Sequence, residues 1–156
     1  MSSPLEVRPI GHVASARTDP ADTTGWGEVE ARIDLTAELG THALDGLAGF
    51  SHAEIVFWFD RITPRASYAE PTRARGRTDM PLIGVFAARG PHRPNPLGVS
   101  ACRILDVGDT WLTVRGLDAV DGTPVLDIKP VMPTLLPADV TEPDWSRQLM
   151  ADYYSG

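Results

Sequence analysis

Alternation of apolar and polar residues dominates this sequence and predicts a protein built mainly from strands. Apolar residues stand at every odd position from Val29 to Leu35, as in a strand with one buried face. A strand-like run interrupted by Pro9 and Gly11 predicts a strand over Glu6 to Ser15, and an apolar, aromatic run predicts one over His52 to Phe59. Four further strands are predicted over Leu82 to Ala88, Val99 to Val107, Trp111 to Leu117 and Pro124 to Ile128. Gly108-Asp109 predicts a hairpin turn between two of them.

Helical periodicity is confined to two segments, Ala37 to Leu47 and Pro143 to Tyr153, the second with a proline in its first turn. About seven short strands, with one or two short helices and no strand-helix alternation, predict a mainly β protein. We expect a single small β-barrel, closed or nearly closed and antiparallel, and not a Rossmann fold.

Length and composition predict one domain over residues 1–156. A chain of 156 residues with 42% hydrophobic content buries one sizeable core. The sequence contains neither a membrane-spanning apolar run nor a signal-peptide pattern, and we expect a cytoplasmic protein. Cys102, the single cysteine, cannot form an internal disulfide; we interpret it as a small core residue, with a catalytic thiol as the weaker alternative.

The net charge of −7 argues at first against a nucleic-acid partner, because phosphate binding depends on Lys and Arg. The charge is unevenly distributed, however. Residues 61–93 contain seven arginines and two acids, a net of +5, which leaves −12 for the rest of the chain. This segment either binds an anionic substrate or simply exposes scattered arginines to solvent.

Five of these arginines lie between Arg61 and Pro81, a stretch without clear periodicity. Such a long loop in a compact domain is typically a lid, a binding loop or a disordered segment. We regard Arg73, Arg75 and Arg77 as candidate substrate-binding residues.

Several common catalytic signatures are missing from the sequence. It has no glycine-rich dinucleotide fingerprint, no phosphate-binding Lys-Ser or Lys-Thr loop, no paired-histidine zinc helix and no Gly-x-Ser-x-Gly turn. The histidines at 12, 42, 52 and 92 stand far apart and the cysteine has no partner at ligand spacing, so we predict no metal site.

The most distinctive segment runs from Arg89 to Gly98. Prolines at 91, 94 and 96 stiffen it and leave its carbonyls free to accept hydrogen bonds. Arg89 and Arg93 are suited to a carboxylate or phosphate, and Asn95 to an adenine-like edge. The alternative is a rigid turn whose arginines pair with the aspartates at 118, 121 or 127.

A second dense segment runs from Asp118 to Pro130. Asp121-Gly122 predicts a tight turn that brings three carboxylates near the basic loop, where they could bind ribose hydroxyls or accept a proton. Lys129 is the only lysine of the chain and has either a role in the site or an acidic neighbour as its partner.

Two long runs, Gly84 to Gly98 and Gly116 to Pro130, resemble the TsaA-like (TrmO) family of S-adenosylmethionine-dependent methyltransferases. Pro9-Ile10-Gly11 and the segment from Leu47 to His52 are similar to its other landmarks, in the same order. The resemblance implies a β-barrel that binds S-adenosylmethionine outside a Rossmann framework. It also implies a homodimer with the cofactor near the subunit interface, and methylation of N6 of N6-threonylcarbamoyladenosine beside the anticodon of tRNA.

The resemblance also implies site residues. The cofactor would contact Gly25, Trp26, Arg61, Phe86, Arg89, Val99, Arg115, Gly116, Leu117 and Asp118, in a pocket that Arg93, Pro94 and Asn95 also shape. Asp121 and Lys129 would lie on the acceptor side. His52, His92 and Asp121 are the candidate bases for removing the acceptor's proton, whereas we expect His12 and His42 to be structural.

Some positions depart from the family pattern. Thr24-Gly25-Trp26-Gly27 replaces a Pro-x-Gln element, Ala88 and Val131 replace a threonine and a tyrosine, and we expect no additional carboxy-terminal domain. These departures leave the cofactor prediction unchanged and the acceptor open. The preferred hypothesis is a tRNA adenosine methyltransferase, followed by a small-molecule methyltransferase. A third is a non-enzymatic cofactor-binding module with Trp26, Trp111 and Trp145 on a partner surface.

Overall fold

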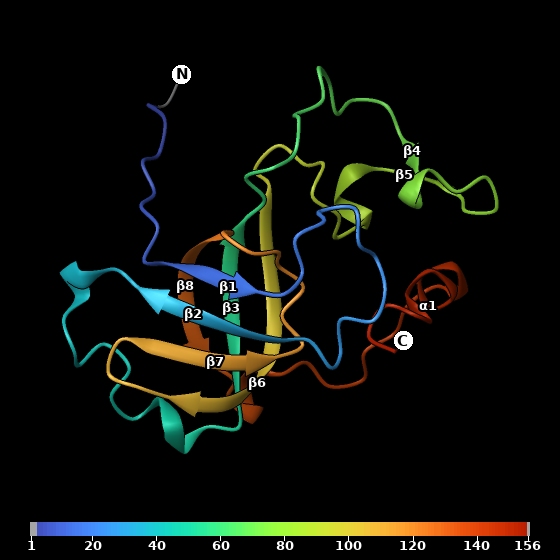
Figure 1. The fold of residues 1–156 in the computed structure, drawn as a ribbon. Helices are drawn as coiled ribbons and strands as arrows, with labels where there is room; N and C mark the ends of the chain where they lie inside the picture. The colour runs from blue at the N-terminus through green and yellow to red at the C-terminus, as the bar shows by residue number, and fades with distance from the viewer. Residues whose placement is uncertain (1–2, 156) are drawn as a thin grey trace.

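Six strands close into an antiparallel barrel (Figure 1) in the order β1-β2-β7-β6-β3-β8. The structure is a computed structural model that describes residues 3–155. The barrel strands are β1 (Gly11–Ser15), β2 (Glu30–Leu35), β3 (His52–Trp58), β6 (Leu97–Val107), β7 (Trp111–Arg115) and β8 (Pro124–Pro130). The predicted fold class, a mainly β barrel without Rossmann topology, is confirmed.

The alternation in the sequence places one face of each strand inside the barrel. Ala53, Ile55 and Phe57 of β3 are almost completely buried, and their outward neighbours are only partly so. Side chains from all six strands and from the turn that follows β7 form one core, which includes Val13, Ile33, Cys102, Leu112, Val114, Leu117 and Val125. Cys102 is therefore a core residue, as predicted.

The barrel wall is incomplete between two of its strands. β6 pairs with β3 from Leu97 to Arg103, but with β7 only from Arg103 to Val107. Within the described residues, the first half of β6 therefore has no strand partner on its β7 side. The chain leaves β7 at Gly116, whose φ of +88° is in the left-handed region that favours glycine. The free edge of β6 lies opposite the segment that follows Gly116.

Two predicted elements differ from the structure. The strand predicted over Leu82 to Ala88 is reduced to β5 (Leu82–Ile83), followed by a short 3-10 helix (Val85–Ala87). β5 pairs with β4 (Thr72–Arg73) outside the barrel. The helix predicted over Ala37 to Leu47 is replaced by two 3-10 turns, Ala37–Leu39 and Leu47–Gly49, joined by irregular chain. Two more 3-10 turns lie at Ala74–Gly76 and Pro133–Leu135.

The predicted second helix is present as α1 (Asp144–Met150). Figure 1 shows α1 beside the barrel, on the same side as β4 and β5. The segment from Arg61 to Pro81 has little regular structure, as predicted; it contains β4 and one 3-10 turn. Within residues 3–155, no helix is long and apolar enough to cross a membrane.

Candidate functional site

Asp118 is the centre of a polar group at the opening between β6 and β7. Ser100, which points inward from the free half of β6, donates a hydrogen bond to Asp118 Oδ1. Tyr153, which follows α1, donates a hydrogen bond to Asp118 Oδ2. Each oxygen of this half-buried carboxylate thus has one donor and keeps lone-pair capacity for another.

Arg89 lies on the same free edge. Its Nη2 donates a hydrogen bond to the carbonyl oxygen of Val99, 2.9 Å away, on the strand residue next to Ser100. The guanidinium is exposed and has further N–H groups available. The structure therefore brings together Arg89, Val99 and Asp118, three of the predicted cofactor residues.

The chain segment after α1 covers this opening. Backbone amides of Gly25, Trp26 and Gly27 donate to the carbonyls of Asp152, Tyr153 and Tyr154 at 3.3, 3.0 and 2.9 Å. The predicted Gly25-Trp26 element thereby joins Asp118 at one site. Trp26 is only 2% exposed, so it is not available for the partner surface of the third hypothesis, and its buried Nε1 has no hydrogen-bond partner among the described residues.

Burial changes the acidity of three groups here. It raises the pKa of the Tyr153 phenol far above its usual value, and the neighbouring Asp118 carboxylate adds to the rise. Burial likewise raises the pKa of Tyr154 to about 12, although Arg89 opposes the change. The pKa of the Cys102 thiol rises to about 12, chiefly through burial, which disfavours a catalytic thiolate.

Several polar groups of the proline-rich loop, residues 89–98, form hydrogen bonds within the protein. Arg93 Nη1 donates to the carbonyls of Ala88 and Gly90 at 3.0 and 3.3 Å. The carbonyls of Pro91 and Asn95 accept backbone amides, and that of Pro96 accepts the amide of Phe59. The expectation that the carbonyls of Pro91, Asn95 and Pro96 are free is wrong, because amides of the loop, of Leu97 and of Phe59 bond them.

Phe86, in the 3-10 turn before the loop, and the loop's remaining predicted residues are exposed. Phe86 is 78% exposed, and His92 and Pro94 are also at the surface. Asn95 lines a groove of about 710 Å³ with Trp58, Pro124 and residues of the amino-terminal arm. The alternative that the arginines at 89 and 93 pair with Asp118, Asp121 or Asp127 is also not observed in the described part of the chain.

Asp121 belongs to a second polar group. Its Oδ1 accepts the backbone amide of Ser15 at 3.0 Å, and its carbonyl accepts Arg61 Nη2 at 2.7 Å. Gly122, with φ of +81°, makes the predicted tight turn. Asp127 instead pairs with Lys129 at 2.7 Å. The carboxylates of Asp118, Asp121 and Asp127 therefore do not form one group, because each is bonded to a different donor.

The remaining predicted cofactor residues lie at the end of β7 that leads to Asp118. Arg115 Nη2 bonds Glu30 Oε1 at 2.7 Å across the β2–β7 pair, and Leu117 is fully buried in the core. Gly116 sets the direction in which the chain approaches Asp118, so its contribution is conformational.

His52 and Lys129 lie away from Asp121. His52 begins β3 and pairs with Arg103, whereas Asp121 precedes β8 near the end of β3. The length of β3, about 20 Å for seven residues, separates these two candidate bases within one chain. Lys129 is on the outer surface, and its hydrogen bond with Asp127 raises its pKa. The alternative of an acidic partner is thus confirmed for Lys129.

The three substrate-loop arginines each have a partner. Arg77 bonds both carboxylate oxygens of Asp79, and Arg73 donates to the carbonyl of Met80. Arg75 donates to the carbonyl of Leu149 at 3.1 Å and lies 5.2 Å from the centre of the Tyr153 ring. Only Arg75 therefore contacts the Asp118 group, through Tyr153.

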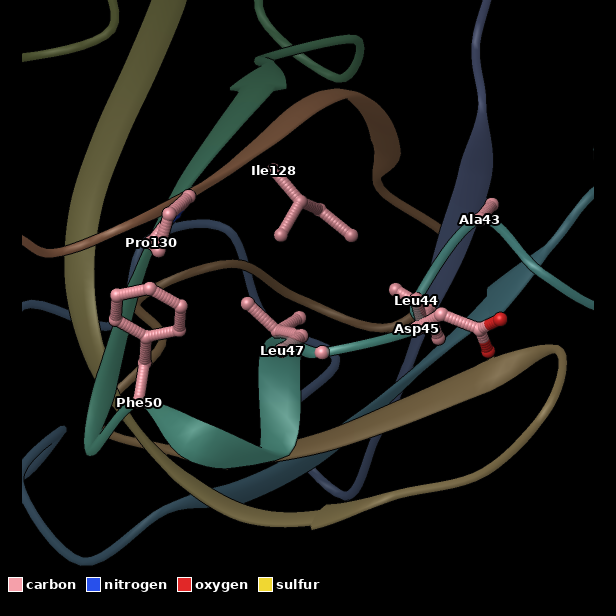
Figure 2. A pocket seen from close by; sticks show the side chains of 8 residues that line it. Ala43, Leu44, Asp45, Leu47, Phe50, Ile128 and Pro130 are labelled. Carbon is pink, nitrogen blue, oxygen red and sulfur yellow. The ribbon is translucent and has the colours of Figure 1, made fainter.

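A smaller apolar pocket of about 280 Å³ lies away from these groups (Figure 2). Leu47 and Phe50 face Ile128 and Pro130 across it. The Leu47 to His52 landmark thus packs against the end of β8 and does not reach Asp118.

Sequence reasoning did not find Ser100 and Tyr153, the two donors to Asp118. Ser100 occupies an inward position of β6, between the buried Gly98 and Cys102. A polar residue at an inward position needs a hydrogen-bond partner, so the sequence could have indicated one here. Nothing in the local sequence of Tyr153 connects it with Asp118, which is 35 residues earlier.

Comparison with known proteins gives a consistent result. Residues 12–135 match the family described as tRNA-methyltransferase O N-terminal domain. A probable S-adenosyl-L-methionine-binding protein of Methanothermobacter thermautotrophicus is 36% identical over 129 residues, which are 81% of this chain and 89% of the relative. A mouse tRNA (adenine(37)-N6)-methyltransferase is 40% identical over 92 residues, 57% of this chain and 20% of its own.

Solved structures agree. The crystal structure of TrmO from Pseudomonas aeruginosa superposes with a TM-score of 0.73 at 30% identity, over 89% of this chain and 61% of the other. The chain spans about three fifths of the length of that structure. The names of these relatives agree with the predicted enzyme class and cofactor. Fold, motifs and relatives together show that this chain belongs to the tRNA-methyltransferase O N-terminal domain (TrmO) family.

Proposed function

We propose that this protein is an S-adenosylmethionine-dependent methyltransferase that methylates N6 of N6-threonylcarbamoyladenosine, next to the anticodon of tRNA. The observation that carries the proposal is the convergence of Arg89 and Asp118, from the two family motifs, at the free edge of β6. The name of the mouse relative supports an adenine in tRNA as the acceptor.

The chemistry of this opening fits the cofactor. S-adenosylmethionine carries a carboxylate, an ammonium group, ribose hydroxyls and an adenine. The exposed Arg89 guanidinium suits the carboxylate, and the remaining lone pairs of Asp118 suit a hydroxyl or the ammonium group. The unpartnered Nε1 of Trp26 indicates that the site still lacks an acceptor.

The bound cofactor supplies a methyl group on a sulfonium sulfur, which already has a good leaving group. The chain therefore has to bind, orient and exclude water. Arg89 and Asp118 would hold two polar ends of the cofactor, while Leu117, which is buried in the core beside Asp118, helps to fix the backbone there. Orientation of this kind contributes several kcal/mol to lowering the barrier, on the order of 7 kcal/mol or more where alignment is good.

A base would assist loss of the acceptor's N6 proton. Asp121 is the better placed of the two aspartates for this role, since Asp118 already accepts two hydroxyl donors. His92 is exposed on the neighbouring loop, whereas His52 begins β3 at the opposite end. We therefore rank Asp121 and His92 before His52 as the group that takes the proton.

We also propose that the protein is a homodimer. Leu97 and Val99 are 40% and 41% exposed on the outer face of β6, next to the half-buried Trp58 of β3. This apolar surface continues from the Arg89 edge, so a second copy seated there would approach the cofactor. Light scattering is expected to give twice the mass of the chain, and a monomer at micromolar concentration would contradict the dimer.

The acceptor is tested by incubating purified protein with S-adenosylmethionine and tRNA that either carries or lacks the N6-threonylcarbamoyl group. Mass spectrometry of the nucleosides is expected to show one added methyl group on the modified adenosine only. The Arg89→Ala variant serves as the inactive control. Transfer to neither tRNA, by a protein that binds the cofactor, would refute the proposed acceptor.

A small-molecule acceptor is the second candidate, because an acidic protein with few free arginines favours it. The net charge is −7, and Arg73 and Arg77 are already occupied within their loop. Methyl transfer that is insensitive to salt and to the anticodon stem-loop would favour this candidate.

A further inference from the structure

The segment after α1 has no counterpart in the sequence motifs, yet it contacts the centre of the candidate site. Tyr153 reaches Asp118 with its hydroxyl group, while the backbone of residues 152–154 is bonded to Gly25, Trp26 and Gly27. We call residues 152–154, which form a turn and not a β-strand, the tail strand.

We propose that the tail strand is a permanent wall of the cofactor site and that Tyr153 is a positioning residue that orients the Asp118 carboxylate. This inference rests on the proposed function, because it assigns a role at the same site.

The contact between the tail strand and residues 25–27, which precede β2, is closely fitted. A Cβ atom on Gly27 would lie 2.3 Å from the carbonyl oxygen of Tyr154, so only glycine allows this approach. Three successive amides of residues 25–27 are bonded to three successive carbonyls of the tail strand. All of these contacts can form only when residues 152–154 lie in this one position.

Arg75 holds the tail strand from the other side. Its guanidinium bonds the carbonyl of Leu149, contacts the sulfur of Met150 at 3.6 Å and lies over the Tyr153 ring. Arg75 has a φ of +50°, an uncommon conformation for a residue with a side chain. Tyr153 is therefore held by residues 25–27 through its backbone and by Arg75 through its ring.

The hydroxyl of Tyr153 acts as a donor under all ordinary conditions. Burial and the Asp118 charge raise the pKa of the phenol, so it keeps its proton and donates to Oδ2. With Ser100 on Oδ1, the plane of the carboxylate is set from two sides. The orientation of the lone pairs that remain on these oxygens is then fixed as well.

The alternative is that the tail strand blocks the site and leaves when the cofactor binds. A segment that substitutes for a ligand would satisfy the polar groups of the site, but Trp26 Nε1 stays buried without a partner while the tail strand is in place. This favours binding of the cofactor beside the tail strand, with the tail strand retained.

The test compares Tyr153→Phe, which removes only the hydroxyl group, with Tyr68→Phe as the matched control outside residues 152–154. Within residues 3–155, the Tyr68 hydroxyl bonds only the backbone amide of Arg65, at 3.3 Å. Calorimetry with S-adenosylmethionine is expected to show about ten-fold or greater weakening for Tyr153→Phe, the effect of losing a hydrogen bond to a charged group. Tyr68→Phe is expected to stay within about two-fold of the parent protein.

Two further measurements separate positioning from mere stability. In steady-state kinetics, Tyr153→Phe should raise the cofactor KM with little change in kcat or in the acceptor KM. In an Asp118→Asn background, Tyr153→Phe should have little additional effect, because the hydroxyl acts through Asp118.

Gly27→Ala provides a second route that leaves Tyr153 unchanged. It should displace the tail strand, speed amide exchange of residues 25–27 and weaken cofactor binding. Unchanged or tighter binding by Tyr153→Phe would overturn the inference while the proposed function stands. A parent protein that binds no S-adenosylmethionine would instead refute the proposed function.

Discussion

At the scale of single residues, two glycines of the same motif differ in their surroundings. A Cβ atom on Gly98 would lie 2.3 Å from the ring of Phe57, its partner across the β3–β6 pair in the barrel interior. A Cβ atom on Gly90 would meet nothing within 4 Å. Gly98 is thus required by core packing and Gly90 is not.

This difference predicts that Gly98→Ala lowers the free energy of unfolding by about 1 to 3 kcal/mol, the range for overpacking a core. Gly90→Ala is the matched control and should change it by less than about 0.5 kcal/mol. Urea denaturation measures both. Equal stabilities for the two variants would contradict the packing of Phe57 against Gly98.

The buried acidic protons predict loss of stability in alkali. The pKa of Cys102 is about 12 in the folded protein and 9.0 in the reference state, and Tyr154 rises from 10.0 to about 12. Both groups ionise in the unfolded chain first, so their stabilising effect is complete below about pH 9 and disappears as the pH rises toward 12.

Thermal melts from pH 8 to 11 should therefore show a falling Tm, with a smaller fall for Cys102→Ala than for the parent. The folded parent should also react slowly with a thiol reagent at pH 8. A rapidly reacting thiol in the folded protein would show that Cys102 is not buried as described.

At the scale of elements, α1 depends on the arginine-rich loop. The helix contains no fully buried residue, and Arg75 provides contacts to its last turn and to Tyr153. A helix with so little buried surface opens readily unless other contacts hold it.

Arg75→Ala should therefore speed hydrogen exchange of the α1 amides by about three- to ten-fold, as expected for the loss of about 1 kcal/mol of contact energy. Arg147→Ala is the control, since Arg147 lies on α1 but is 68% exposed and makes only surface ion pairs. Similar exchange rates in the two variants would mean that Arg75 does not anchor the helix.

Five of the six barrel strands followed from alternation within a few residues, and β1 proved shorter than its predicted run. Leu82 to Ala88 was predicted as a strand because it is apolar, but Leu82 and Phe86 are exposed and the barrel closes without it. The Ala37 to Leu47 segment has helical spacing, yet Gly40 and Gly46 adopt positive φ and interrupt it. The local sequence shows which segments are apolar. Which of these segments pair as strands depends on how the barrel closes.

At the scale of the whole molecule, the sequence indicated Arg89 and Asp118 through their motifs but not the contacts that connect them to the rest of the site. Tyr153 joins Asp118 only because the chain returns past α1 to Gly25–Gly27, a path that no local signal encodes. His52 was a candidate base because histidine can accept a proton near neutral pH. The strand pairing of β3 places it at the opposite end of that strand from Asp121.

The uneven charge predicts how binding of the proposed tRNA substrate would depend on salt. The chain has 21 acidic and 14 basic residues, and seven of its arginines lie in residues 61–93, so we expect only a few of them to contact phosphates. Raising the salt concentration from 0.05 to 0.2 M should weaken tRNA binding by about ten-fold or more if some three phosphates are neutralised. Fluorescence anisotropy with an anticodon stem-loop measures the effect, and salt-independent binding would contradict it.

We propose that the opening between β6 and β7 binds S-adenosylmethionine through Arg89 and Asp118. Calorimetric titration of the parent protein, of Arg89→Ala and of the remote control Arg32→Ala tests this binding. The parent and Arg32→Ala are expected to bind the cofactor, and Arg89→Ala is expected to bind it at least about ten-fold more weakly. Equal affinity of all three proteins would contradict the site, and no binding by the folded parent would contradict the function.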